Sequence, residues 1–132
     1  MLNKSFVIVA ALIVILLVPG CESLTGPEKK ANVVMIEGPI SEDGYSIFYV
    51  KGRVQNKGDN TAMFTTITIY IRNSLSGLLA QETTYIDDTE LVPGETSPWD
   101  TIFSDSGRTI RDQMDFSKTT FEIKWDEKKS AF

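Results

Sequence analysis

Two stretches of alternating apolar and polar residues, 48–55 and 66–72, constrain the fold of this 132-residue chain more than any other feature. The apolar residues that share a face are Phe48, Val50 and Val54 in the first stretch and Ile67, Ile69 and Ile71 in the second. Period-two alternation of β-branched and aromatic residues is typical of half-buried antiparallel strands. The turn-rich residues 56–60 between them predict a β-hairpin in which Gly58 adopts a positive φ.

Turn signals divide the rest of the chain into further short strands. We expect these strands at residues 31–36, 78–88, 97–103 and 117–126, with turns at 41–44 and 73–77, a type II turn at Pro93-Gly94 and a helical turn within 109–116. Five large aromatic residues are expected to supply the core: Phe48, Trp99, Phe103, Phe121 and Trp125. This spacing of strands predicts an all-β fold, an immunoglobulin-like antiparallel β-sandwich of about seven strands.

The first 20 residues have the composition of a signal peptide. Lys4 precedes an unbroken apolar run at residues 6–18. This run is shorter than the ~20 residues that a membrane-spanning helix needs, and it has the length of the apolar region of a signal peptide. We therefore expect residues 1–20 to direct export and to lie outside the folded domain, which we place at residues 31–127.

The residues that follow the apolar run, Val18-Pro19-Gly20-Cys21, resemble the lipobox of prokaryotic lipoproteins. Gly20 and Cys21 match its two most restrictive positions, whereas Pro19 departs from the small or aliphatic residue usual there. The resemblance implies cleavage after Gly20, a lipid with palmitate-type chains on Cys21, and a polar tether at residues 21–30. It places the domain on the extracytoplasmic face of the cell membrane or outer membrane. The alternative for Cys21 is a free thiol after an uncleaved anchor, or a small apolar residue without a role.

Composition excludes several classes of function. The chain has one cysteine and no histidine, which excludes an intramolecular disulfide, a Cys/His zinc site and a catalytic triad that uses histidine. Without the first 20 residues, 12 basic residues stand against 18 acidic ones, a net charge of −6. Because nucleic-acid binding depends on Lys and Arg contacts to phosphate, we expect no nucleic-acid partner.

The order of motifs over residues 31–126 resembles FxLYD-type immunoglobulin-like domains of prokaryotic lipoproteins. The matching motifs are Val50-x-Gly52-x-Val54-x-Asn56-x-Gly58 and Leu91-x-Pro93-Gly94-Glu95. The name-giving motif keeps Tyr70 but has Ile67, Ile69 and Ile71 where the family has Phe, Leu and Asp. The resemblance implies an extracytoplasmic module with no catalytic residues and no cofactor.

Few residues suggest a binding site. Four tyrosines could form an outward aromatic strip that contacts a sugar or a protein: Tyr45, Tyr49, Tyr70 and Tyr85. Tyr49 and Tyr70, expected on the polar faces of neighbouring strands, are the best such pair, although cross-strand pairing that stabilises the sheet is the alternative. Arg108 and Arg111, in the irregular segment 104–117, are candidates for a partner contact. The carboxylates do not have the spacing of a calcium-binding loop, and we expect them to be solvated and to hold no metal: Asp87, Asp88, Glu90, Asp105, Asp112 and Asp115.

These features predict a non-catalytic, lipid-anchored module that binds or positions another cell-envelope protein. The first alternative is a carbohydrate- or small-ligand-binding module that uses the exposed tyrosine face. A small hydrolase with paired carboxylates is the least favoured alternative, because a sandwich of this size offers little cleft.

Overall fold

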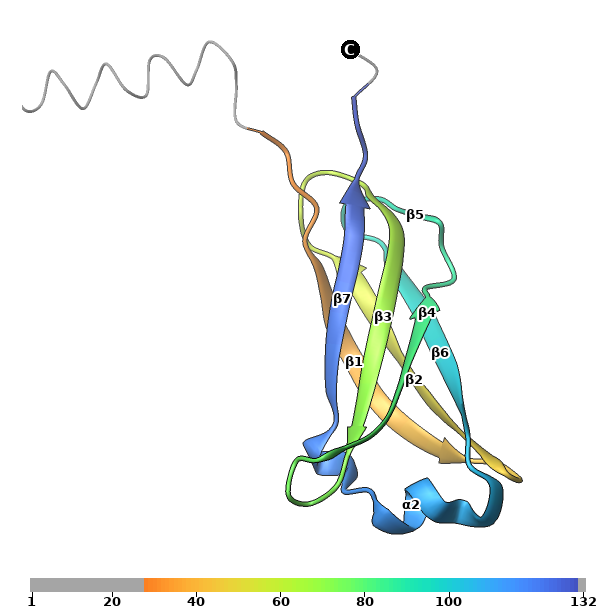
Figure 1. Cartoon of the computed structure of the whole chain (residues 1–132). Helices are drawn as coiled ribbons and strands as arrows, with labels where there is room; N and C mark the ends of the chain where they lie inside the picture. Colours follow the sequence, from red (N-terminus) through yellow and green to blue (C-terminus); the bar gives the residue numbers. More distant parts are fainter. Residues whose placement is uncertain (1–27, 131–132) are drawn as a thin grey trace, which may run out of the picture.

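Seven strands form two antiparallel sheets in the part of the chain that the computed structural model describes, residues 28–130 (Figure 1). The first sheet has the order β1-β2-β6, with bounds Val33–Asp43, Ile47–Asn56 and Thr96–Ser104. In the second sheet, β3 (Ala62–Arg72) has β7 (Thr120–Glu127) on one side and β4 (Leu78–Tyr85) with the short β5 (Glu90–Leu91) on the other. The immunoglobulin-like antiparallel sandwich predicted from the sequence is confirmed.

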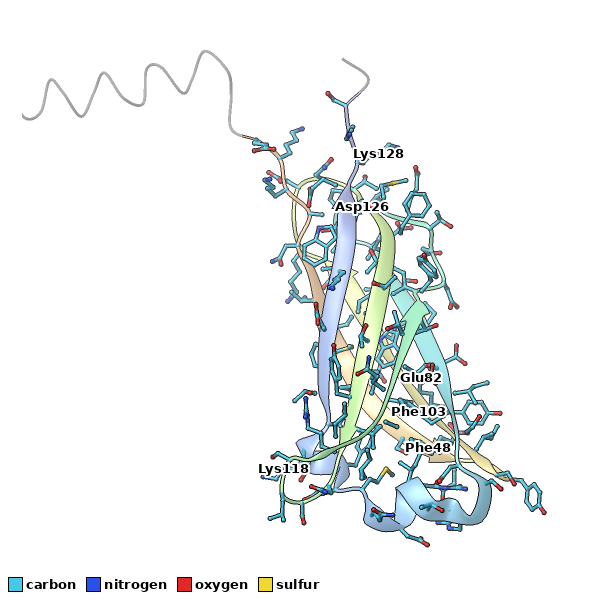
Figure 2. All side chains as sticks on the ribbon, in the orientation of Figure 1. Phe48, Glu82, Phe103, Lys118, Asp126 and Lys128 are labelled. Atoms are coloured by element: carbon cyan, nitrogen blue, oxygen red, sulfur yellow. The ribbon has the colours of Figure 1, made fainter. Side chains whose placement is uncertain are left out.

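The core is made by the inward faces of β2, β3 and β6. The residues predicted to share a face on these strands are all buried: Phe48, Val50, Val54, Ile67, Ile69, Ile71, Trp99 and Phe103. The rings of Phe48 and Phe103 stack across the β2–β6 pair with their centroids 4.9 Å apart, and both lie in the same half of the sandwich (Figure 2). Burial of side chains of this size contributes about 1.5–3 kcal/mol each, which accounts for a stable core without a disulfide.

The prediction that Phe121 supplies the core is wrong. Its side chain is 42% exposed, while Ile123 and Trp125 on the same strand pack only partly against the core. The alternation along β7 is as expected, but β7 pairs only with β3 and therefore forms an edge of its sheet. Phe121 lies near the beginning of this edge strand.

The predicted hairpin between β2 and β3 is also wrong, because the two strands belong to different sheets. Each strand has one apolar face, and the two faces lie on opposite sides of the same core instead of side by side. Residues 57–61 cross between the sheets. Gly58 does not adopt the positive φ expected of a hairpin turn. Glycine is required there by close packing, since a Cβ atom would lie 2.3 Å from the backbone oxygen of Lys30.

The first strand is longer than predicted. It does not end at Gly38-Pro39 but continues to Asp43, so the turn lies at residues 44–46 and not at 41–44. Register shifts between Met35 and Ile40 form a bulge that accommodates the glycine at φ 85° and the proline. Gly52 faces this bulge from β2. A Cβ atom there would lie 2.4 Å from the oxygen of Glu37 and 2.9 Å from the Trp99 indole, so only glycine leaves room for both groups.

Three turn predictions hold, and one of them is the turn at residues 73–77 between β3 and β4. Gly94 has φ 87° and the Glu95 amide donates to the Val92 oxygen at 3.0 Å, as in the predicted type II turn. A short helix, α2 (Thr109–Gln113), lies within the segment where a helical turn was expected. The three-residue helical turns Ser106–Arg108 and Phe116–Lys118 flank it.

Asn56, at the end of β2, is fully buried and forms four hydrogen bonds. Its Oδ1 atom accepts from the amides of Asn32 at 3.1 Å and Gly58 at 3.0 Å. Its Nδ2 group donates to the backbone oxygens of Asn60 at 2.7 Å and Leu91 at 2.9 Å. One side chain therefore joins the beginning of the domain, the crossing between the sheets and β5.

Glu127, at the end of β7, also binds the beginning of the domain and the segment that crosses between the sheets. Its carboxylate accepts hydrogen bonds from the Ala31 amide at 2.7 Å, the Trp125 indole at 2.7 Å and the Asn60 amide group at 3.1 Å. The hydrogen bond from Ala31 lowers the pKa of this carboxyl more than its partial burial raises it. Lys30 is also held: its amide donates to the Asp59 carboxylate at 2.8 Å, and its oxygen accepts from the Asp59 amide at 2.9 Å. The last residue of the predicted tether is therefore attached to the domain.

Acidification is expected to destabilise the domain partly through Glu127. Because its pKa in the folded protein lies below the unfolded value of 4.5, its contribution is complete above that value and is lost as the pH falls through the folded pKa. We expect thermal denaturation, followed by circular dichroism, to show a midpoint that falls below about pH 5, with a shallower fall in Glu127→Gln. Glu82→Gln, at an exposed position of β4, is the control and should keep the wild-type slope. Equal slopes in the two variants would contradict the prediction.

Candidate functional site

Three connections meet at the end of the sandwich that lies opposite the point where Lys30 joins the domain (Figure 1). They are the β1–β2 turn at residues 44–46, the β3–β4 loop at 73–77 and the β6–β7 connection at 105–119. We call this the distal end. Lys118 lies at the distal end and Lys128 at the other end of the molecule (Figure 2).

A buried ion pair organises the distal end. The Nε atom of Arg111 lies 2.8 Å from Oδ2 of Asp105, and the two side chains are 3% and 1% exposed. Asp105 also accepts hydrogen bonds from the amides of Ile110 at 2.7 Å and Arg111 at 3.0 Å. Burial alone would raise the pKa of Asp105, but these amides and the guanidinium outweigh it and hold the pKa below its usual value. The carboxylate is therefore ionised at neutral pH.

This arrangement corrects two expectations. Asp105 was expected to be solvated, but the first turn of α2 and the Arg111 guanidinium enclose it. Arg111 was a candidate for a partner contact, but its side chain is buried and committed to Asp105. Arg108 is different: its side chain is 56% exposed, and it lies 3.7 Å from Asp43 and 3.9 Å from Asp112. Of the two arginines, only Arg108 is accessible to a partner.

Hydrogen bonds join the three connections into one frame. Arg111 donates to the backbone oxygen of Gly44 at 2.9 Å, and the Asp105 amide donates to the oxygen of Ser46 at 2.8 Å. On the other side, the Asp115 amide donates to the oxygen of Arg72 at 2.9 Å. Within the β3–β4 loop, the Asn73 side chain accepts from the amides of residues 75 and 77. The loops are thus fixed to each other as well as to their strands.

Two apolar side chains project from this frame. Tyr45 is 97% exposed and Leu75 is 90% exposed, the highest values for large hydrophobic residues in the part of the chain described. The backbone beside them is strained. Of the four non-glycine residues with positive φ in residues 28–130, three lie at the distal end: Ser46, Ser76 and Arg108. Such conformations cost about 1–3 kcal/mol each and gather at functional sites. A fixed frame that exposes apolar tips suits contact with a protein surface.

The structure does not bring Tyr49 and Tyr70 together. Tyr49 lies on the outer face of β2 and Tyr70 on the outer face of β3, so they occupy opposite outer faces of the sandwich. The Tyr70 hydroxyl donates to Glu122 at 3.2 Å, and the Arg72 guanidinium lies 5.6 Å from the centre of its ring. The predicted two-tyrosine surface is therefore wrong, and Tyr70 contributes to interactions within its own sheet.

Other predicted features fall outside this site. Gly20 and Cys21, with the rest of the signal segment, lie outside the described residues. Within residues 28–130, no group of three acidic residues is arranged to hold a metal ion. No helix in the same range has the length and apolar character needed to cross a membrane. Comparison with family models, with curated proteins and with solved structures finds no match to this chain.

Sequence reasoning missed Leu75 and considered Tyr45 only as one of four tyrosines of an outward strip, although a separate signal for both is present. Each is a single large apolar residue inside a turn of small and polar residues, Gly44-Tyr45-Ser46 and Ser74-Leu75-Ser76. Such a residue cannot reach the core from the tip of a turn, so it is exposed whatever the pairing of the strands. A search for apolar residues within turns, rather than for polar clusters, would have found both.

Proposed function

We propose that this protein is a lipid-anchored, extracytoplasmic lipoprotein whose FxLYD-like sandwich is a non-catalytic module that binds another protein of the cell envelope through its distal end. The observation that carries the proposal is the presentation of Tyr45 and Leu75 on the hydrogen-bonded frame described above, at the end farthest from Lys30. The lipobox resemblance at Cys21 supports the anchor, and the motifs of residues 50–95 support the family.

The position of the proposed anchor agrees with this use of the distal end. An extended segment from Cys21 to Lys30 spans about 30 Å, at ~3.3 Å per residue. A lipid on Cys21 then holds the domain by the end where Lys30 joins it, with the distal end directed away from the bilayer. Loops at the far end of the sandwich are the part best able to reach a neighbouring protein.

The chemistry of the distal end also favours a protein partner. Tyrosine and arginine are enriched among the residues that contribute most to protein–protein binding, and the rim of such sites is polar. Tyr45 and Arg108 supply these two side-chain types, with Leu75 as an apolar addition. Because the surrounding loops are held by hydrogen bonds, little conformational entropy is lost when they are bound. Asp105, the buried carboxylate of the distal end, forms an ion pair with Arg111 and is not available for acid–base chemistry.

The first experiment tests the anchor through the intact mass of the protein extracted from host membranes. We expect a mass that begins at Cys21 and includes acyl chains. The Cys21→Ala variant should lack this species and remain unprocessed. A wild-type mass that begins at Met1, without acyl chains, would contradict the lipid anchor and leave residues 6–18 as an uncleaved anchor.

The second experiment tests the binding surface in the full lipidated chain. A photoreactive amino acid replaces Tyr45, Leu75 or, as the control, Glu82, which is exposed on β4 and belongs to none of the three connections of the distal end (Figure 2). We expect the same cross-linked protein from positions 45 and 75 and none from position 82. Cross-links from position 82 alone, or equal cross-linking to many proteins from all three positions, would contradict binding through the distal end.

A further inference from the structure

A second site lies where β3 begins, at a bulge between β3 and β7. The register of this pair shifts between Met63 and Thr66, and Phe64 within the bulge has φ 51°. A positive φ is rare for a bulky residue and requires strong local support. The Phe64 side chain is nevertheless 53% exposed, so burial of its ring does not explain the conformation.

Phe64 borders a pocket of about 220 Å³ at the end of β4. The residues that line it are Phe64, Thr65, Tyr85, Ile86, Asp88 and Thr89. Main-chain hydrogen bonds join its two sides, from the Phe64 amide to the Thr89 oxygen at 3.0 Å and from the Ile86 amide to the Thr65 oxygen at 3.1 Å. Tyr85 is 67% exposed, so two aromatic side chains are available at the edge of a pocket whose backbone is fixed.

One charged group of the pocket has no partner among the described residues. Asp88 is half-buried, and within residues 28–130 its carboxylate forms no ion pair or hydrogen bond. The hydroxyl of Thr65 also forms no hydrogen bond there, but it is buried in the wall and has almost no surface open to the pocket. An unpaired carboxylate beside two exposed aromatic side chains points to a cation as the ligand.

The charged residues that line the pocket indicate which kind of ligand it can bind. Its lining contains one carboxylate and no lysine or arginine. The hollow on the other side of Phe64 contains both Lys124 and Asp126, so its charge is balanced. Aromatic faces attract cations, and a carboxylate beside them adds a direct ion pair. A pocket of this volume admits one side chain.

We propose that the pocket binds the ammonium group of a lysine side chain carried by a basic polypeptide segment of a partner. Asp88 pairs with the ammonium, and Phe64 and Tyr85 flank the lysine stem. The net charge of −6 over residues 21–132 favours the approach of a basic segment. The site is independent of the lipid on Cys21 and of the distal end.

The test is a titration of the isotope-labelled full chain in detergent micelles with the peptide acetyl-Gly-Lys-Gly-amide, followed by NMR. We expect saturable shifts confined to residues 64–65 and 85–89, with an affinity that falls as salt is added. The same peptide with norleucine in place of lysine keeps the stem, removes the charge and should give no saturable shifts. Asp88→Asn should weaken binding about tenfold or more. Asp87→Asn, at an adjacent carboxylate that does not line the pocket, should bind like the wild type.

Three outcomes would overturn the proposal. The first is the absence of saturable shifts with the lysine peptide while the spectrum of the folded domain is retained. The second is equal binding of the norleucine peptide, which would make the pocket an apolar site. The third is binding of maltose at these residues in place of the peptide, which would make it a carbohydrate site. None of them bears on the lipid on Cys21 or on cross-linking at Tyr45, so this proposal and the proposed function fail separately.

Discussion

Replacement of Arg111 by methionine is expected to lower the free energy of unfolding by about 3–5 kcal/mol. Methionine replaces the aliphatic stem of arginine but carries no charge. The Asp105 carboxylate, 1% exposed, is therefore left without its counter-ion. It also removes the hydrogen bond to the backbone oxygen of Gly44, which joins α2 to the β1–β2 turn. Urea denaturation at pH 7 measures the loss. Cross-linking from position 45 should weaken in parallel, because the turn that carries Tyr45 loses its support.

Two controls separate the buried charge from other effects. Arg108→Met removes an exposed arginine of the same segment, whose ion pairs are solvent-screened, and should cost less than about 1 kcal/mol. The double variant Asp105→Asn with Arg111→Met removes both charges and should be more stable than Arg111→Met alone. The interpretation fails if Arg111→Met costs no more than Arg108→Met, or if the double variant is the least stable of the set.

Asn56→Leu is expected to lower the free energy of unfolding by about 3 kcal/mol or more. The substitution conserves volume, but it removes the partners of two backbone amides and two backbone oxygens in a fully buried position. Each group left without a partner costs about 1–3 kcal/mol, and partial access of water reduces the sum. Urea denaturation measures the loss. Limited proteolysis should also show faster cleavage near Lys30, since Asn56 holds residue 32.

The matched control for Asn56 is its neighbour on the outer face of β2. Gln55 donates one exposed hydrogen bond to the Gly94 oxygen at 3.1 Å, and Gln55→Leu should cost less than about 1 kcal/mol. If the two leucine variants are equally stable, the buried network of Asn56 does not hold the junction between the sheets.

The faces of the strands could be predicted from the sequence, but their partners could not. Alternation with a period of two assigns Ile67, Ile69 and Ile71 to one face whatever strand lies beside them. It carries no information about whether the next strand pairs in the same sheet or packs across the core. The residues between β2 and β3 are rich in turn formers in both cases. Gly58 was therefore attributed to a hairpin, although its role is close packing against Lys30.

The candidate site was predicted in part. The irregular segment 104–117 was correctly selected as the longest without strand character, and it forms much of the distal end. The sequence could not show that Arg111 is buried and Arg108 exposed, because both arginines stand among acidic and polar residues. That difference depends on Asp105, which the fold places beneath the first turn of α2. The strain at Phe64 likewise follows from a bulge in pairing with a strand some 60 residues later, which local sequence does not specify.

The hydrogen bonds that Glu127 accepts have a consequence for the order in which the chain folds. The hydrogen bond from the Ala31 amide joins residues 96 positions apart, and β3 acquires its β7 neighbour only when the last part of the chain is present. Contacts so distant in sequence form after the entropic cost of closing a long loop has been met, and such topologies fold in milliseconds to seconds. While residues 120–127 are still within the ribosome, the chain therefore lacks one edge of the second sheet and the hydrogen bond that holds Ala31. The domain is therefore completed only after residues 120–127 have left the ribosome and can pair with β3.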